Sequence, residues 1–148
     1  MTLYAAIHKT IPILAPVSVV WNALTNPDLM KLWMSESELN IVTEWKIGGP
    51  ILIRGNLHNA TFENTGFILN FEKERKLSYS HLSSLSNLAD RTENYSVLEF
   101  DLTAIDNYTM LSISAHTFPT EAIYRHLVFY WTVTPEILKK FIEAGKCT

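Results

Sequence analysis

Tyr79 and His81, in the stretch KLSYSHL, are the residues whose types and spacing are best suited to chemistry. In an extended strand alternate side chains share a face, so both point the same way as Leu77 and opposite to the serines between them. If Leu77 is inside, a few hydrogen-bonding groups lie on an apolar wall, which is how a ligand is oriented in a cavity. The alternative is structural: a tyrosine and a histidine bonded to backbone or water, as buried polar groups usually are.

The other four histidines offer little for catalysis or metal binding. His8, His58, His116 and His126 show no zinc-ligand spacing, and His8 and His116 fall on the polar phase of their strands, where we expect them to be exposed. No Gly-x-Ser-x-Gly elbow is present, and the only cysteine, Cys147, is next to the last residue. From the sequence we therefore name no catalytic residue, no metal site and no cofactor.

Arg54 is the one candidate carboxylate clamp. With Asn56 and His58 it forms a polar phase opposite Ile51 and Ile53, so the pattern places all three toward solvent. A bulge near the Gly-Gly-Pro turn that precedes them would reverse that phase and turn Arg54 inward. Both orientations stay open at this stage.

Composition and charge limit the class of protein. The 148 residues are 47% hydrophobic and 18% charged, which favours a single globular domain over residues 1–148. The net charge is −3 and no Lys/Arg cluster occurs, so we expect neither a nucleic acid nor a membrane surface as a partner. The chain lacks a signal-peptide pattern and an apolar run of about 18 residues, and a lone thiol near its end fits a reducing cytoplasm.

The positions of the secondary-structure elements follow from hydrophobic periodicity. Residues 3–13 alternate as expected for a strand. A helix follows over 16–25, with Pro16 at its first position. A second helix over 27–34 is capped by Asn26 and has Leu29, Leu32 and Trp33 as its apolar side. The pattern then predicts strands near 39–46, 51–58, 65–72, 76–82, 95–105 and 109–117, with a long polar loop at 83–94. A helix over 121–131 precedes a kink or break at Thr134-Pro135 and a second segment over 135–144.

Short connections predict an antiparallel meander of about seven strands, an α+β architecture in which only the C-terminal helix is long enough to cover the sheet. A curved sheet wrapped on one helix leaves a space that the two short helices close at one end. The residues expected near the wall of this cavity are Trp33, Met34, Tyr124, Leu127, Val128 and Trp131. A well-packed core is the alternative for all of them.

Five stretches occur in family order over nearly the whole chain: APVSVVWNALTNPDLMKLWM, TEWKIGGPILIRG, GFILNFEKERKLSYSHL, VLEFDLTAIDNYTMLSIS and RHLVFYWTVTPEILKKFIE. In these the sequence resembles the family named after the C-terminal domain of the Hsp90 ATPase activator, within the START/Bet v 1-like superfamily. The resemblance implies the helix-grip fold. In the superfamily it implies binding of lipids, sterols or polyketides, cyclisation or hydroxylation with partners, or docking on a chaperone.

Three functions therefore stay open. The leading hypothesis is a cytoplasmic binding module for a small, largely apolar molecule. The second is a cyclase, dehydratase or hydrolase with His81 as general acid or base and Tyr79 or Arg54 polarising a carbonyl, although we expect that the chain is not an enzyme. The third is a protein-interaction domain, as a chaperone cofactor or a homodimer. A cavity of about 300 Å³ or more would favour a ligand, and a filled core would favour a protein partner.

Overall fold

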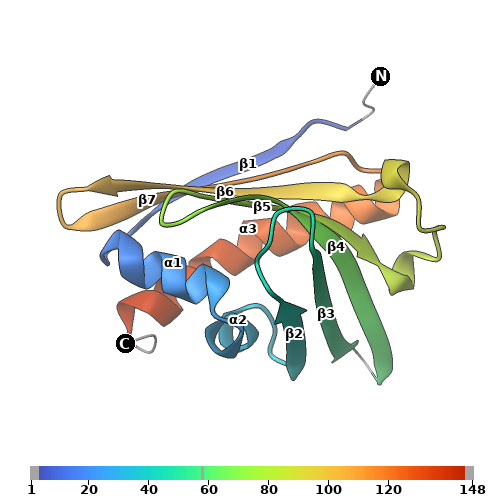
Figure 1. Cartoon of the computed structure of the whole chain (residues 1–148), viewed down its shortest axis with the longest axis horizontal. Helices are drawn as coiled ribbons and strands as arrows, with labels where there is room; N and C mark the ends of the chain where they lie inside the picture. The colour runs from blue at the N-terminus through green and yellow to red at the C-terminus, as the bar shows by residue number, and fades with distance from the viewer. Residues whose placement is uncertain (1–3, 58, 146–148) are drawn as a thin grey trace.

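The computed structural model describes residues 4–57 and 59–145, and contains seven strands, three α-helices and two short 3-10 helices in this part of the chain (Figure 1). The start of the strand predicted at residue 3, His58 and Cys147 lie outside the described residues. In chain order the elements are β1 (Ile7–Ile13), α1 (Val17–Thr25), α2 (Pro27–Trp33), β2 (Leu39–Thr43), β3 (Pro50–Leu57), β4 (Ala60–Glu72), β5 (Lys76–Ser83), η1 (Ser84–Ser86), η2 (Thr92–Asn94), β6 (Ser96–Ile105), β7 (Tyr108–His116) and α3 (Glu121–Glu143).

The strands form one antiparallel sheet in the order β1-β7-β6-β5-β4-β3-β2, which confirms the predicted meander. The period-2 alternation decides which face is covered: Leu98, Phe100 and Leu102 of β6 are buried, whereas Glu99 and Asp101 are half-exposed on the other face. The sheet is therefore apolar on the face that meets α3.

The Gly48-Gly49 turn is joined to an irregularity in β4. Gly48 has a φ of 82°, a left-handed conformation that glycine adopts without steric cost. Its N–H donates to the Ile68 carbonyl at 2.7 Å, and the Ile68 N–H donates to the Gly49 carbonyl at 2.9 Å. These bonds continue the β3–β4 pairing past Pro50 and Phe67, beside the point where the β4–β5 register shifts between Ile68 and Asn70.

The two short helices differ from expectation in detail. Pro16 is the N-cap of α1 and not its first helical residue, while Asn26 caps α2 as predicted by accepting a hydrogen bond from the Asp28 N–H at 3.0 Å. The buried side chains of α2 are Met30 and Trp33, which are three residues apart on one face. Leu32 is 57% exposed because it lies about 100° round the helix from Trp33.

The predicted break at Thr134-Pro135 is wrong: α3 runs without interruption from Glu121 to Glu143. A proline inside a helix removes one backbone hydrogen bond and costs roughly 3 kcal/mol. Burial of the turns after Pro135 offsets this cost. Leu138, Phe141 and Ile142 are buried, and burying each such side chain contributes about 1.5–3 kcal/mol to stability.

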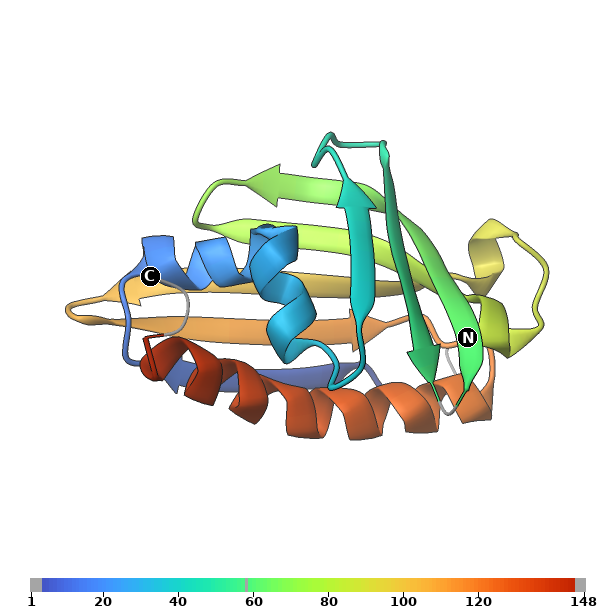
Figure 2. The ribbon, with the colours of Figure 1, turned by 90° about the horizontal axis from the view of Figure 1, so that it is seen from below.

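Figure 2 shows α3 lying along the sheet, with α1 on the side of its C-terminal half. Hydrogen bonds join that half to β1 and to the residue that follows β1. Lys139 donates to the Pro12 carbonyl, and Glu143 accepts from the Leu14 N–H at 2.8 Å and from Lys139 at 2.8 Å. The Leu14 and Lys139 contacts hold the pKa of the Glu143 carboxyl below its usual range.

Gly66 gives a test of the close approach between β4 and β5. A Cβ there would lie 1.7 Å from the Ser80 carbonyl oxygen, so Gly66→Ala must move one strand. We expect a loss of ~3 kcal/mol or more in the free energy of unfolding, or a fall of roughly 10 °C in Tm, measured by calorimetry.

Gly55→Ala is the matched control. The atoms nearest to its added Cβ are Leu39 Cδ2 at 2.7 Å and Phe62 Cζ at 2.9 Å, which are ends of side chains that can move. We expect a cost of about 1 kcal/mol or less. Equal losses in both variants would contradict a backbone clash at Gly66.

Candidate functional site

A cavity of about 420 Å³ lies between the sheet and the first half of α3. Strands β2 to β6, the end of α2, both 3-10 helices and α3 contribute to its wall, and most of the wall is apolar, with Ile53, Leu98 and Leu127 among its residues. None of the lining residues, all from the described part of the chain, is Asp, Glu, Lys or Arg. The cavity is therefore suited to an uncharged, mostly apolar molecule.

Tyr79 and His81 both line this cavity. Tyr79 is 2% exposed and its ring stacks with Phe100 at a centroid distance of 6.0 Å. Within the described residues neither the Tyr79 hydroxyl nor the His81 ring has a side-chain hydrogen bond. The structural alternative from the sequence named backbone or water as the partners of this pair, and the described residues supply no backbone partner.

Burial controls the protonation of the pair. It raises the pKa of the Tyr79 phenol, with a smaller contribution from Tyr130, so the hydroxyl keeps its proton at neutral pH. Burial lowers the pKa of His81 to about 4, with a smaller contribution from His126. At neutral pH both side chains are uncharged.

Two residues that line the cavity also have a polar atom that is fully buried without a partner: Trp131 Nε1 and Asn64 Oδ1. Trp131 is 2% exposed and meets Phe100 and Tyr130 edge-on, with centroid distances of 5.5 and 4.9 Å. The sequence analysis named Trp131 but missed Asn64, because the predicted strand began at residue 65 whereas β4 begins at Ala60.

The helix face that meets the cavity is not quite the predicted one. Leu127 and Trp131 line it together with Ile123 and Tyr130, whereas Tyr124 and Val128 do not. Tyr124 instead stacks with Tyr4 at 4.9 Å and meets Phe118 at 5.0 Å. Residues 124 and 128 each follow a lining residue by one position, which is about 100° round a helix, and this explains the error.

Tyr130 and His126, both missed by the sequence analysis, lie where α3 passes the end of α2. The Tyr130 hydroxyl donates to the Met34 carbonyl at 2.7 Å, so it is occupied, unlike that of Tyr79. Met34 lines the cavity, as does His126, whose ring stacks with Tyr130 at 6.3 Å. No sequence signal separated Tyr130 from its neighbours, because α3 is aromatic over most of this stretch.

Trp33 was predicted at the cavity wall but packs in the core. It is 3% exposed, and its Nε1 donates to the Ala23 carbonyl of α1 at 2.9 Å. It does not line the cavity. This hydrogen bond links α2 to α1.

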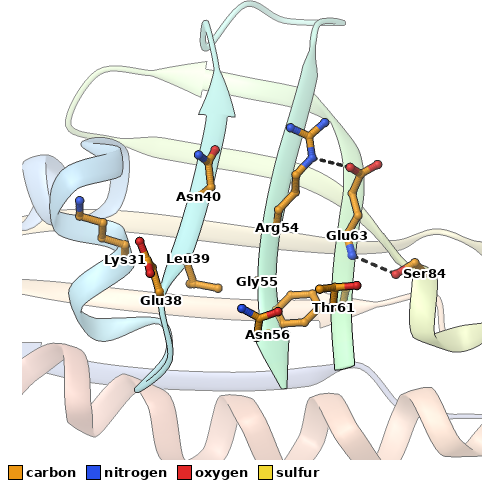
Figure 3. A pocket seen from close by; sticks show the side chains of 11 residues that line it. Lys31, Glu38, Leu39, Asn40, Arg54, Gly55, Asn56, Thr61, Glu63 and Ser84 are labelled. Carbon is orange, nitrogen blue, oxygen red and sulfur yellow. Dashed lines mark hydrogen bonds and ion pairs between the residues drawn. The ribbon is translucent and has the colours of Figure 1, made fainter. Parts of the chain in front are cut away.

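Arg54 does not reach the cavity either. It is exposed on the other face of β3 and pairs with Glu63, Nε to Oε2, at 2.5 Å (Figure 3). The β3–β4 register is continuous, so no bulge turns Arg54 inward. It borders an open, polar hollow of about 650 Å³, to which Lys31 and Glu38 also contribute (Figure 3).

The polar loop predicted at 83–94 borders the cavity. It contains η1 and η2, and Leu85, Ser86 and Asn94 are among the lining residues. Ser83 caps η1 by accepting from the Leu85 N–H, and Asn94 Nδ2 donates to the Ala89 carbonyl at 2.9 Å. The loop is therefore internally hydrogen-bonded where it meets the cavity.

Two classes of feature are absent from the described residues. No group of three or more His, Cys, Asp or Glu side chains there could hold a metal ion. None of the helices described is long and apolar enough to cross a membrane.

The neutral state of the half-buried His81 predicts a pH dependence of stability. In the unfolded chain this imidazole takes up a proton near pH 6.5, whereas in the folded chain it does so only near pH 4, so the unfolded state binds more protons between these values. Stability should therefore fall as the pH drops from about 6.5 to about 4, by up to roughly 3 kcal/mol from this residue.

The measurement is urea unfolding at pH 7, 6, 5 and 4.5 for the wild type and for His81→Gln. The variant lacks only the His81 imidazole, while the carboxylates that also titrate in this range are unchanged. Its free energy of unfolding should therefore fall less over the same pH range. The same pH dependence in both proteins would contradict a lowered pKa of His81 in the folded chain.

The comparisons with known proteins agree with this fold. ChR145 from Cytophaga hutchinsonii is 32% identical, with all of both chains covered and a TM-score of 0.81. NE0264 from Nitrosomonas europaea is 19% identical over 97% of each chain, with a TM-score of 0.77. The Aha1 dimer from Colwellia psychrerythraea is 19% identical over 97% of this chain and 99% of that one, with a TM-score of 0.73.

No protein with a curated description matches the chain significantly. Residues 14–143 match the family described as Activator of Hsp90 ATPase homolog 1-like protein. This match covers most of the chain and agrees with the resemblance in the sequence and with the helix-grip arrangement of sheet and α3. The chain belongs to the Activator of Hsp90 ATPase homolog 1-like family.

Proposed function

We propose that this chain is a cytoplasmic binding protein that holds a small, largely apolar molecule between the sheet and α3. The observation that carries the proposal is a cavity of about 420 Å³ with no ionic side chain in its wall and with unpaired polar groups on Tyr79 and His81. Its volume lies within the range of roughly 300–1,000 Å³ that is usual for ligand pockets. A domain that only bound other proteins would have no use for it.

Catalysis by His81 is less well supported. A general base works best when its pKa is near the operating pH, and burial lowers the pKa of His81 to about 4. Arg54, the proposed carbonyl-polarising alternative to Tyr79, is outside the cavity and paired with Glu63. A binding role requires neither a proton transfer nor a second charged group.

Native mass spectrometry of the purified protein tests the proposal. We expect a small molecule bound at one per chain that leaves when the protein is denatured. Protein that is empty after growth under several conditions would contradict it.

Two variants of adjacent residues locate any bound molecule. Leu127→Trp projects a larger side chain into the cavity and should abolish the added mass, while Val128→Trp, outside the cavity wall, should keep it. Circular dichroism shows whether both variants fold. Retention of the molecule by a folded Leu127→Trp protein would place it elsewhere.

A second candidate function is self-association through the outer face of α3. Phe129, Val133 and Ile137 lie at intervals of four residues and are 70%, 42% and 44% exposed. An apolar stripe of this kind suits packing against another helix. A relative of the same fold is a dimer in solution, so a second copy of this chain is the partner that we propose.

Sedimentation equilibrium tests this candidate. We expect a species of twice the 16.9 kDa chain mass that Val133→Glu converts to monomer, because a buried unpaired carboxylate in the interface would cost several kcal/mol. Thr132→Glu, an exposed neighbour on the same helix, is the control and should stay dimeric. A wild-type protein that is monomeric at every concentration would rule out a second copy and leave the stripe to another protein, such as a chaperone.

A further inference from the structure

We propose that a second copy of this chain packs antiparallel on the exposed stripe of α3 (Phe129, Val133 and Ile137) and covers the mouth of the cavity, so that the bound molecule is released only when the two copies separate. The proposal rests on both functions proposed above, ligand binding and self-association, and connects them. The observation behind it is that the cavity mouth and the stripe share one face of α3.

The exposure of the lining residues locates the mouth of the cavity. Along the chain from β5 into η1, these residues change from the buried Tyr79 to Leu85, which is exposed. Along α3 they change from the buried Trp131 to His126 and Ala122, which are both exposed. The cavity therefore opens between η1 and the first turns of α3, and Ala122 and His126 belong to its rim.

The rim and the stripe are continuous on the surface of α3. Each residue advances about 100° round an α-helix, so Ala122, His126, Phe129, Val133 and Ile137 all fall within an arc of about 80°. Over this stretch the helix rises roughly 22 Å. A second α3, with 23 residues and therefore roughly 34 Å long, can cover the rim and the stripe together. Figure 2 shows α3 along the lower edge of the molecule, where a second copy can reach it.

The charges beside the stripe favour a second copy as its occupant. Arg125 and Glu136 are exposed and lie about 60–80° round the helix to the same side of Val133, so both border the stripe. In two antiparallel helices related by a two-fold axis, each residue faces the one at the same distance beyond the axis. An axis beside residues 130 and 131 brings Phe129 against the partner's Val133, and Arg125 against the partner's Glu136. The face is therefore self-complementary, as an interface between identical copies requires.

The contacts that these two charged side chains make within one chain allow such pairing. Arg125 contacts Glu121 at 2.8 Å, and Glu136 contacts Lys9 at 3.8 Å. Surface ion pairs of this kind contribute little to stability. Both side chains can therefore turn toward a second copy at low cost.

The same register places the partner over the cavity mouth. The partner's Ile137 faces residue 125 and lies beside His126 on the rim, and the partner's Lys140 faces Ala122. The isoleucine side chain and the aliphatic part of the lysine then cover the rim. Because the axis is two-fold, both cavities of the dimer are covered in the same way.

Charge reversal tests the register. We expect Arg125→Glu and Glu136→Arg each to raise the dissociation constant of the dimer about 5-fold or more, because each puts two like-charged pairs into the interface. The double variant restores both pairs with their charges exchanged and should return to within about 3-fold of the wild type. Sedimentation equilibrium at low salt measures all four proteins. A double variant that dimerises no better than the single variants would contradict the antiparallel register.

Release of a neutral fluorescent probe tests whether the partner covers the mouth. Protein loaded with N-phenyl-1-naphthylamine is mixed by stopped flow with excess β-cyclodextrin, which captures the probe once it leaves the protein. We expect release from the dimeric wild type to be at least about tenfold slower than from dilute, monomeric protein. Val133→Glu, which does not alter the cavity wall, should release at the fast rate at every concentration. Thr132→Glu stays dimeric and should release as slowly as the wild type.

The outcomes separate this inference from the functions on which it rests. Equal release rates from dimer and monomer would overturn the inference and leave both proposed functions intact. A protein that never binds the probe, or that stays monomeric at every concentration, would overturn the inference together with the corresponding proposed function. Circular dichroism establishes that each variant is folded before its release rate is compared.

Discussion

The packing of α3 along the apolar face of the sheet is the contact on which the rest of the structure depends. Trp131 sits near the middle of this contact, 2% exposed, with its ring edge-on to Phe100 of β6. The short helices α1 and α2 are marginal on their own, since isolated helices of their length are unstable in water. They are held because Trp33 bonds to α1 and the Met34 carbonyl accepts from Tyr130 of α3.

The interior is filled at one end of this contact and hollow at the other. The C-terminal half of α3 buries Leu138, Phe141 and Ile142, and it is hydrogen-bonded to β1 through Lys139. The N-terminal half instead faces the cavity, with Ile123, Leu127 and Trp131 in its wall.

The sequence predicted the fold well because period-2 alternation states directly which side chains face the helix. It places Tyr79 on the inner face for the same reason that Leu77 and Phe100 are there. The prediction was wrong where a short stretch allows more than one helical phase. Leu32 is next to the buried Trp33, and Val128 is next to Leu127, which lines the cavity. Pro135 misled for a different reason, because a local breaking signal was overridden by tertiary burial of the turns that follow it.

The candidate site was only half predictable, since the unpaired state of its groups is a property of three-dimensional neighbours. Nothing in the residue letters separates Tyr130, whose hydroxyl is bonded, from Tyr79, whose hydroxyl is not. Each buried polar group without a partner costs about 1–3 kcal/mol, so a chain selected for stability alone would replace Tyr79 and Trp131 by residues without such groups. Marginal stability gives little room for such costs. On the proposed function, a bound molecule would offset this cost at Tyr79, whose hydroxyl belongs to a cavity wall that combines apolar packing with a few hydrogen-bonding groups.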